Sequence, residues 1–171
     1  MEQRLDYPKL SPEAVRAMYG LEGYLAKSTL DQPLRDLVKI RASQINGCAY
    51  CIDMHTKDAR AAGETEQRIY ALNAWRETPF FTDRERAALA WTEALTRIGD
   101  GVHDELFAAT RGHFSEKELV DLTWAVAAIN AWNRVAISMR AVPGLYQPRK
   151  PHAPAGEPGG VSEAGDGSSH A

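Results

Sequence analysis

The chain has 171 residues, of which 44% are hydrophobic and 25% charged, and its formal net charge at pH 7 is -3. This composition is ordinary for one globular domain with its own core, and the charge gives no reason to expect nucleic acid or a membrane surface as a partner. The N-terminus lacks the apolar core of a signal peptide, and no run of about 18 apolar residues predicts a membrane span. The 2 cysteines exclude a disulfide-built scaffold, and we expect a cytoplasmic protein.

The chain predicts an all-α fold of about six to eight helices. Apolar residues recur at spacings of three and four, proline and glycine fall between the segments, and β-branched alternation is almost absent. Capping signals, including boxes at residues 82–85 and 115–118, mark where helices begin. We expect helices over about 12–28, 31–45, 48–62, 65–78, 83–98, 103–111 and 116–139. The last is apolar on nearly every side, so we expect it to be deeply buried.

The composition changes at Gln147. Beyond it proline, glycine and serine dominate, and there is no aromatic residue. Such a segment cannot bury enough surface to offset the entropy lost on ordering. We therefore predict one all-α domain over residues 1–146 and a disordered Pro/Gly/Ser-rich tail over residues 147–171.

The stretch from Asn46 to His55 holds both cysteines. Cys48 and Cys51 are three residues apart, and His55 follows four residues after the second. The pair Asn46-Gly47 predicts a turn, so a helix begins at or just after Cys48. At 3.6 residues per turn, the two thiols and the imidazole then fall on one narrow face. Such a face suits either a redox site or a metal site.

The redox interpretation rests on the acidity of the thiols. A thiol reacts as its thiolate, and both a helix N-terminus and a neighbouring imidazole lower the pKa of a thiol. The Cys-x-x-Cys spacing allows a disulfide to close after one sulfur has been oxidised. His55, one turn beyond Cys51, is placed to take or relay a proton.

Two other interpretations of the cysteines remain open. A structural zinc site needs four ligands, usually in two pairs, and the chain has neither a second cysteine pair nor a His-x3-5-His pair. The cysteines could also be buried structural residues, although Asn46, Asp53 and His55 make their surroundings polar. The histidines outside the motif are His103, His113, His152 and His170.

Three runs of the sequence carry a resemblance to a known family. Residues 37–67, 85–95 and 129–134 resemble the AhpD-like alkylhydroperoxidases of the carboxymuconolactone decarboxylase superfamily, and the likeness extends over about residues 5–145. The site pattern of that family is an acidic residue, eleven positions, Cys-x-x-Cys, three positions and a histidine. Cys48, Cys51 and His55 match it, and the acidic position falls on Asp36, where the family usually has the longer glutamate. Some members have a histidine where this chain has Tyr50.

The resemblance implies a thiol-dependent peroxidase with an AhpD-like helical bundle. It implies a homo-oligomer, commonly a trimer or hexamer, that needs no metal, flavin or haem and takes electrons from an external dithiol or disulfide reductant. It assigns peroxide attack to Cys51, resolution to Cys48, and the roles of base and proton relay to His55 with Asp36. The position of Cys48 at the helix start argues for the reverse order of the two thiols.

Two alternative functions differ from the peroxidase in class. One is a lactone decarboxylase or isomerase of the same superfamily, although such enzymes generally lack the Cys-x-x-Cys pair found here. The other is a non-enzymatic redox sensor whose oligomer changes when the disulfide forms. Turnover with a peroxide and a thiol reductant distinguishes the peroxidase from both.

Overall fold

The structure is a computed structural model that describes residues 2–148. It confirms the predicted all-α fold, because these residues form helices and no strand. The α-helices are α1 (Tyr7–Leu10), α2 (Pro12–Ala26), α3 (Gln32–Asn46), α4 (Ala49–Ala61), α5 (Glu66–Ala71), α6 (Asp83–Thr96), α7 (Asp104–Arg111) and α8 (Glu116–Met139). Two 3-10 helices, η1 (Leu72–Glu77) and η2 (Ile98–Asp100), follow α5 and α6.

The predicted helices lie close to their expected positions, with two differences. The short helix α1 was not expected, and the segment after Thr65 is α5 followed by η1, with a non-helical residue at Ala74. Both capping boxes are present, with Thr82 and Ser115 as the N-caps of α6 and α8. The predicted disordered tail lies outside the described residues, apart from Gln147 and Pro148.

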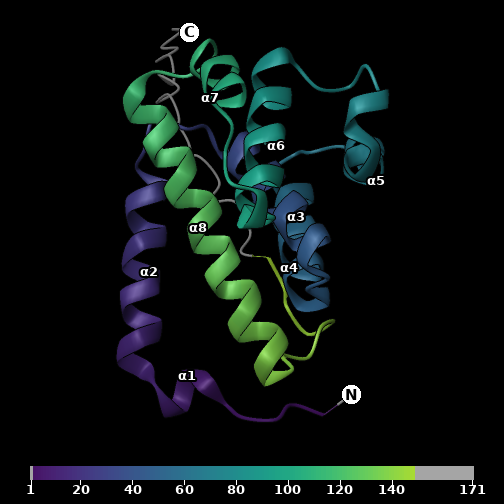
Figure 1. Ribbon diagram of the computed structural model, residues 1–171. Coiled ribbons are helices and arrows are strands. Elements are labelled where there is room, and N and C mark those ends of the chain that lie inside the picture. The colour runs from purple at the N-terminus through teal and green to yellow at the C-terminus, as the bar shows by residue number, and fades with distance from the viewer. Residues whose placement is uncertain (1, 149–171) are drawn as a thin grey trace, which may run out of the picture.

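Helix α3 is the centre of the bundle. It packs against α4, α6 and α8, while α2 lies along α8 on the other side of that helix (Figure 1). Leu34 and Val38 of α3 belong to one apolar cluster with residues of α6 and α8, and Leu37 and Ile40 belong to a second with α4, α5, η1 and α6. Because two clusters meet on it, α3 is buried on nearly all sides.

A buried ion pair connects α3 to α6. The Arg41 guanidinium lies 2.7 Å from a carboxylate oxygen of Glu93, which also accepts a hydrogen bond of 2.9 Å from the indole of Trp75. Arg41 and Glu93 are both 7% exposed. Glu93 also pairs with Arg76 at 2.5 Å, so this one carboxylate connects α3, η1 and α6.

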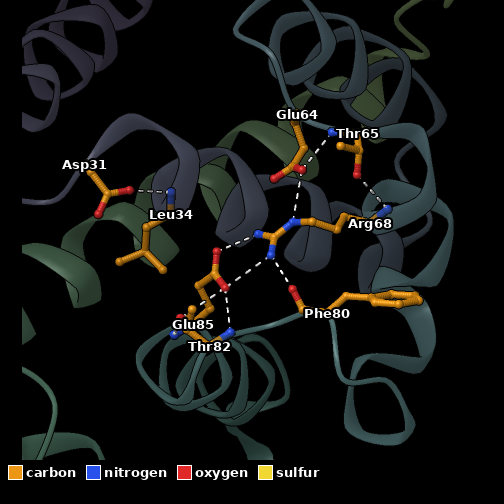
Figure 2. A network of polar contacts seen from close by, with 8 residues as sticks. All are labelled: Asp31, Leu34, Glu64, Thr65, Arg68, Phe80, Thr82 and Glu85. Atoms are coloured by element: carbon orange, nitrogen blue, oxygen red, sulfur yellow. Dashed lines mark hydrogen bonds and ion pairs between the residues drawn. The ribbon is translucent and has the colours of Figure 1, made fainter.

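A second polar network holds α5 against the start of α6 (Figure 2). Its centre is Arg68, whose guanidinium lies 3.0 Å from a carboxylate oxygen of Glu64 and 2.5 Å from one of Glu85. It also donates to the carbonyl of Phe80. Glu85 in turn accepts from the backbone N–H of Thr82 at 2.8 Å. The network therefore holds α5, which has only 6 residues, and the loop after η1 against α6.

Within the single chain, helix α8 is buried on one face. Val120 and Trp124 are 56% and 52% exposed in the single chain. The inward face instead carries polar side chains, with Asp121 and Asn133 fully buried among the apolar residues. No helix within residues 2–148 is both long and apolar enough to cross a membrane.

The end of α3 makes a testable demand on Gly47. This residue is the C-cap of α3 with φ of 69°, in the left-handed region, and a Cβ added there would meet nothing within 4 Å. We predict that Gly47→Ala lowers the free energy of unfolding by about 1 kcal/mol through backbone strain alone. The measurement is urea denaturation at fixed protein concentration.

Gly20→Ala is the matched control. Gly20 lies inside α2, is exposed, and also has nothing within 4 Å of an added Cβ. The same substitution there should raise stability by about 0.5–1 kcal/mol, because alanine favours a helix interior. Equal effects at both positions would contradict the assignment of a left-handed cap.

Candidate redox site

The junction between α3 and α4 places the two cysteines. Gly47 turns the chain, and the Cys48 N–H donates to the Ser43 carbonyl at 3.0 Å. Cys48 is the N-cap of α4, and Cys51 lies in its first turn. The predicted turn before the motif, and the position of Cys48 just before the first turn of the helix, are both confirmed.

Cys48 and Cys51 are joined by a disulfide, with their Cα atoms 5.3 Å apart. Both side chains are almost fully buried, at 1% and 2% exposed. The backbone N–H of Cys51 points at the Cys48 sulfur, at 3.4 Å. A helix N-terminus thus faces the sulfur, which is the arrangement that favours a thiolate when the disulfide is reduced.

Three asparagines fasten this junction to α8. The Asn46 amide donates to the carbonyl oxygens of Asn130 and Asn133, at 2.9 and 2.8 Å. Asn133 then donates to the Ser43 hydroxyl at 3.1 Å, and Asn130 to the Thr96 hydroxyl at 3.1 Å. The network ties the end of α3 to the middle of α8, immediately before the cysteines.

A cavity of about 260 Å³ opens beside Cys51. Its wall includes Cys51 but not Cys48, so Cys51 is the cysteine that borders this cavity. Much of the remaining wall is aromatic, and the rings of Tyr19 and Trp132 lie 5.6 Å apart. The other lining residues are Tyr7, Glu22, Lys39, Tyr50, Met54, His55 and Ala136. The cavity is therefore largely aromatic, and one of the two cysteines borders it.

His55 lies in this wall as a neutral imidazole. Burial, with a smaller contribution from the positive charge of Lys39, lowers the pKa of His55 to about 3. At neutral pH the ring can accept or pass on a proton, but it carries no positive charge. In this disulfide form His55 therefore offers no positive charge to the sulfurs, and the expected effect of the imidazole on thiol acidity stays a prediction.

Asp36 lies on the other side of His55. It does not line the cavity with Cys51. It shares a second, polar hollow of about 360 Å³ with His55, Lys39, Asp58 and Tyr146. Its Oδ2 atom is buried and has no hydrogen-bond partner within residues 2–148. Burial, reinforced by the charge of Asp58, raises the pKa of Asp36 to about 6 against the opposing effect of Lys39.

The predicted site residues thus fall into two spaces, and His55 and Lys39 line both of them. Cys51 and His55 share the cavity, Asp36 and His55 share the hollow, and Cys48 is joined to Cys51 by the disulfide. In the described part of the chain, no three His, Cys, Asp or Glu side chains are grouped where they could hold a metal ion.

Sequence reasoning missed several lining residues. Lys39 and Glu22 form an ion pair of 2.6 Å that joins α3 to α2 at the cavity. Tyr7 and Tyr19 come from α1 and α2, at least 29 positions before the cysteines. The only signal for Lys39 was its position three residues after Asp36, which places both side chains toward one face of α3.

The chain after α8 folds back over α4. The Gly144 N–H donates to an Asp53 carboxylate oxygen at 2.9 Å, and the Lys57 ammonium donates to the Tyr146 carbonyl at 3.1 Å. The Tyr146 hydroxyl lies 2.6 Å from an Asp58 carboxylate oxygen. We call residues 140–148 the C-terminal strap, and Tyr146 forms one wall of the polar hollow.

Comparison with known proteins places the chain in a family. The sequence profile of the carboxymuconolactone decarboxylase family matches residues 12–94. The uncharacterized protein YdfG of Bacillus subtilis is 48% identical over 140 residues, covering 81% of this chain and 95% of YdfG. An Agrobacterium tumefaciens structure, described as a protein of unknown function and putative antioxidant defence protein AhpD, is 44% identical with a TM-score of 0.81, covering 85% of this chain and 100% of that one. The chain therefore belongs to the carboxymuconolactone decarboxylase family and has the fold of its AhpD-like members.

More distant structures share the fold alone. The debrominase Bmp8, solved in complex with 2,3,4-tribromopyrrole, is 20% identical with a TM-score of 0.73, covering 80% of this chain and 74% of Bmp8. The AhpD-like fold therefore carries more than one activity, and the function of this chain must be argued from its own site.

The raised pKa of Asp36 has a consequence for stability. The folded protein holds this carboxyl near pKa 6, whereas an unfolded aspartate titrates near pH 3.9. Below both values the two states are equally protonated, and stability is lost as the pH rises through 6 because a charge is then buried. We predict that Asp36→Asn stabilises the protein by about 2–3 kcal/mol at pH 8 and by almost nothing at pH 3.5.

Asp53→Asn provides a control of opposite sign. Hydrogen bonds from Gly144 and Lys57 lower the pKa of Asp53, so its ionised form favours folding at neutral pH. That substitution should destabilise the protein at pH 8, and the effect should fade as the solution becomes acidic. Urea denaturation curves at the two pH values measure both variants. If Asp36→Asn instead destabilises the protein at pH 8, the ionised Asp36 carboxyl group does not oppose folding and the prediction is wrong.

Proposed function

We propose that this protein reduces organic hydroperoxides through a dithiol–disulfide cycle of Cys48 and Cys51. The observation that carries the proposal is that Cys51, paired with Cys48 in a disulfide, lines an aromatic cavity next to the neutral imidazole of His55. Family membership and the 44% identity to a putative antioxidant defence protein support the same activity.

The placement of the sulfurs favours Cys51 as the attacking thiol. Its thiolate attacks the terminal peroxide oxygen, the O–O bond breaks, and the alcohol leaves as Cys51 becomes a sulfenic acid. The Cys48 thiolate then attacks the Cys51 sulfur, the disulfide forms, and the hydroxyl departs as water. An external dithiol reduces the disulfide and is itself oxidised. Cys48, hidden behind Cys51, suits resolution better than attack on a substrate in the cavity.

His55 is the group that moves the proton. As a neutral base it takes the proton of the Cys51 thiol, and as an acid it returns the proton to the departing alkoxide. Asp36 does not line the cavity, so it acts on His55 or on water in the polar hollow and not on the peroxide. The shorter side chain of Asp36 compared with glutamate is compatible with this outer role.

The lining of the cavity favours a bulky apolar substrate over hydrogen peroxide. Aromatic rings and Met54 surround the space beside the sulfur, and such a surface binds an apolar group by removing it from water. A homo-oligomeric assembly, a trimer or hexamer, belongs to the same proposal. So do a cytoplasmic location and an external dithiol or disulfide reductant as partner.

Peroxide consumption tests this function. Purified protein supplied with dithiothreitol should consume cumene hydroperoxide catalytically, and Cys51→Ser should reduce the rate to the uncatalysed background, because no thiolate then faces the cavity. Cys48→Ser should still consume about one equivalent of peroxide and leave Cys51 oxidised without a disulfide. The measurements are loss of hydroperoxide and intact-protein mass.

The two alternative functions give different results in this assay. A redox sensor would form the disulfide without sustained turnover, and a lactone enzyme would be indifferent to both cysteine substitutions. If the wild-type protein and Cys51→Ser consume peroxide at the same rate, the peroxidase proposal is wrong.

A further inference from the structure

Once His55 has passed on the proton that it takes from Cys51, the neutral imidazole supplies no positive charge to the thiolate. The imidazole is neutral at any pH near 7 because burial lowers its pKa to about 3. The start of α4 contributes only a partial charge. Of the residues that line the cavity, all within residues 2–148, Lys39 alone carries a positive charge. Lys39 thus lines the same cavity as Cys51 without being part of the Cys-x-x-Cys motif.

Lys39 is held in this position by Glu22. The ammonium lies 2.6 Å from one carboxylate oxygen of Glu22, and the other oxygen accepts a hydrogen bond of 3.2 Å from the Trp132 indole. The side chains of Lys39 and Glu22 are only 16% and 21% exposed, so water screens their charges weakly. Glu22 therefore connects the charge beside the thiol to α2 and α8.

We propose that the Lys39 ammonium is the cation that stabilises the Cys51 thiolate. The Glu22 carboxylate, which is paired with Lys39, offsets part of that positive charge and so weakens the stabilisation. The inference deepens the proposed function by naming an electrostatic residue of that site, and it rests on the proposed function only where it assigns the thiolate a role in turnover. An opposite charge held near an ionisable group in a poorly solvated site favours the charged form of that group.

The other groups around Cys51 do not replace Lys39. Tyr7, Tyr19 and Tyr50 come from three different helices, and burial raises the pKa of Tyr7 and of Tyr50, which keeps those phenols neutral. Asp53, on the same helix as Cys51, is 3.0 Å from Lys57 and accepts from the C-terminal strap.

The polar hollow contains the groups that compete with Cys51 for the charge of Lys39. Lys39 also lines this hollow, where the carboxyl groups of Asp36 and Asp58 lie. Glu22, Asp36 and Asp58 are thus the acidic residues that line the two spaces bordered by Lys39. Substitutions of Lys39 and Glu22, which both line the cavity, therefore test the effect of the ammonium on Cys51.

The test is the pH dependence of alkylation in a Cys48→Ser background, where Cys51 is the only thiol and no disulfide can form. Lys39→Met keeps the length of the side chain and removes the charge, so iodoacetamide should modify Cys51 about tenfold more slowly at pH 7. Glu22→Gln frees the ammonium from its counter-ion and should move the midpoint of the profile to lower pH. Lys39→Arg should stay close to the parent protein.

Opposite shifts of the alkylation midpoint in Lys39→Met and Glu22→Gln distinguish an electrostatic effect from damage to the fold. A merely structural role would move Lys39→Met and Glu22→Gln in the same direction, because both break the same ion pair, and that result would overturn the inference. An unchanged midpoint in Lys39→Met, with a large change in His55→Asn, would also overturn it in favour of the histidine. Thermal unfolding of each variant checks that the fold is intact.

The alkylation profile does not depend on peroxide chemistry. If the wild-type protein fails to consume hydroperoxide while Lys39→Met and Glu22→Gln shift the midpoint in opposite directions, the proposed function is wrong and the assignment of Lys39 stands. If hydroperoxide is consumed and the midpoints do not move, the proposed function stands and the assignment of Lys39 is wrong.

Discussion

The hydrogen bonds of Asn46 are the constraint on which the rest of the site depends. One side-chain amide joins the last residue of α3 to two asparagines of α8, just before the chain turns at Gly47. Without it, the side-chain oxygen of Asn133 would lose its donor in a buried setting, at a cost of about 1–3 kcal/mol, while that of Asn130 would keep the Arg134 guanidinium. Because the turn follows directly, the position of Asn46 also sets the direction in which α4 begins and therefore where both sulfurs lie.

His55 divides the interior beside α4 into two chemically different spaces. On one side it meets an aromatic cavity with Cys51, and on the other a polar hollow with Asp36 and Asp58. An apolar substrate and the water that exchanges protons with the site can thus approach one imidazole from different directions. The aromatic side of the imidazole is thus chemically distinct from the side that carries the carboxyl groups.

Much of the fold was predictable because its signals are local. The caps at Asp31, Thr82 and Ser115 and the turn at Asn46-Gly47 act within a few residues, so they read correctly from the sequence. The Cys48, Cys51 and His55 face was predictable for the same reason, since one helix presents all three. The single chain buries only one face of α8, so burial of the outer side, where Trp124 is exposed, stays a prediction.

The remainder of the site depends on how distant helices pack. The resemblance to the AhpD-like family implied that Asp36 belongs to the site, but only the packing of α3 against α4 places it in the polar hollow with His55. The neutral state of the imidazole follows from burial, which no spacing reveals. The ion pair of Lys39 with Glu22 joins residues 17 positions apart on two helices, and nothing in either helix alone points to the other.

The C-terminal strap extends the part of the chain that the site needs beyond the last helix. The last helix stops at Met139, which would look like a natural place to shorten the chain. However, Tyr146 walls the hollow that holds Asp36, and Gly144 satisfies a carboxylate of α4. A version cut after α8 would keep every helix and both cysteines and still open the proton side of the site to bulk water. Expression designs and tags therefore belong beyond residue 148, where the described contacts end.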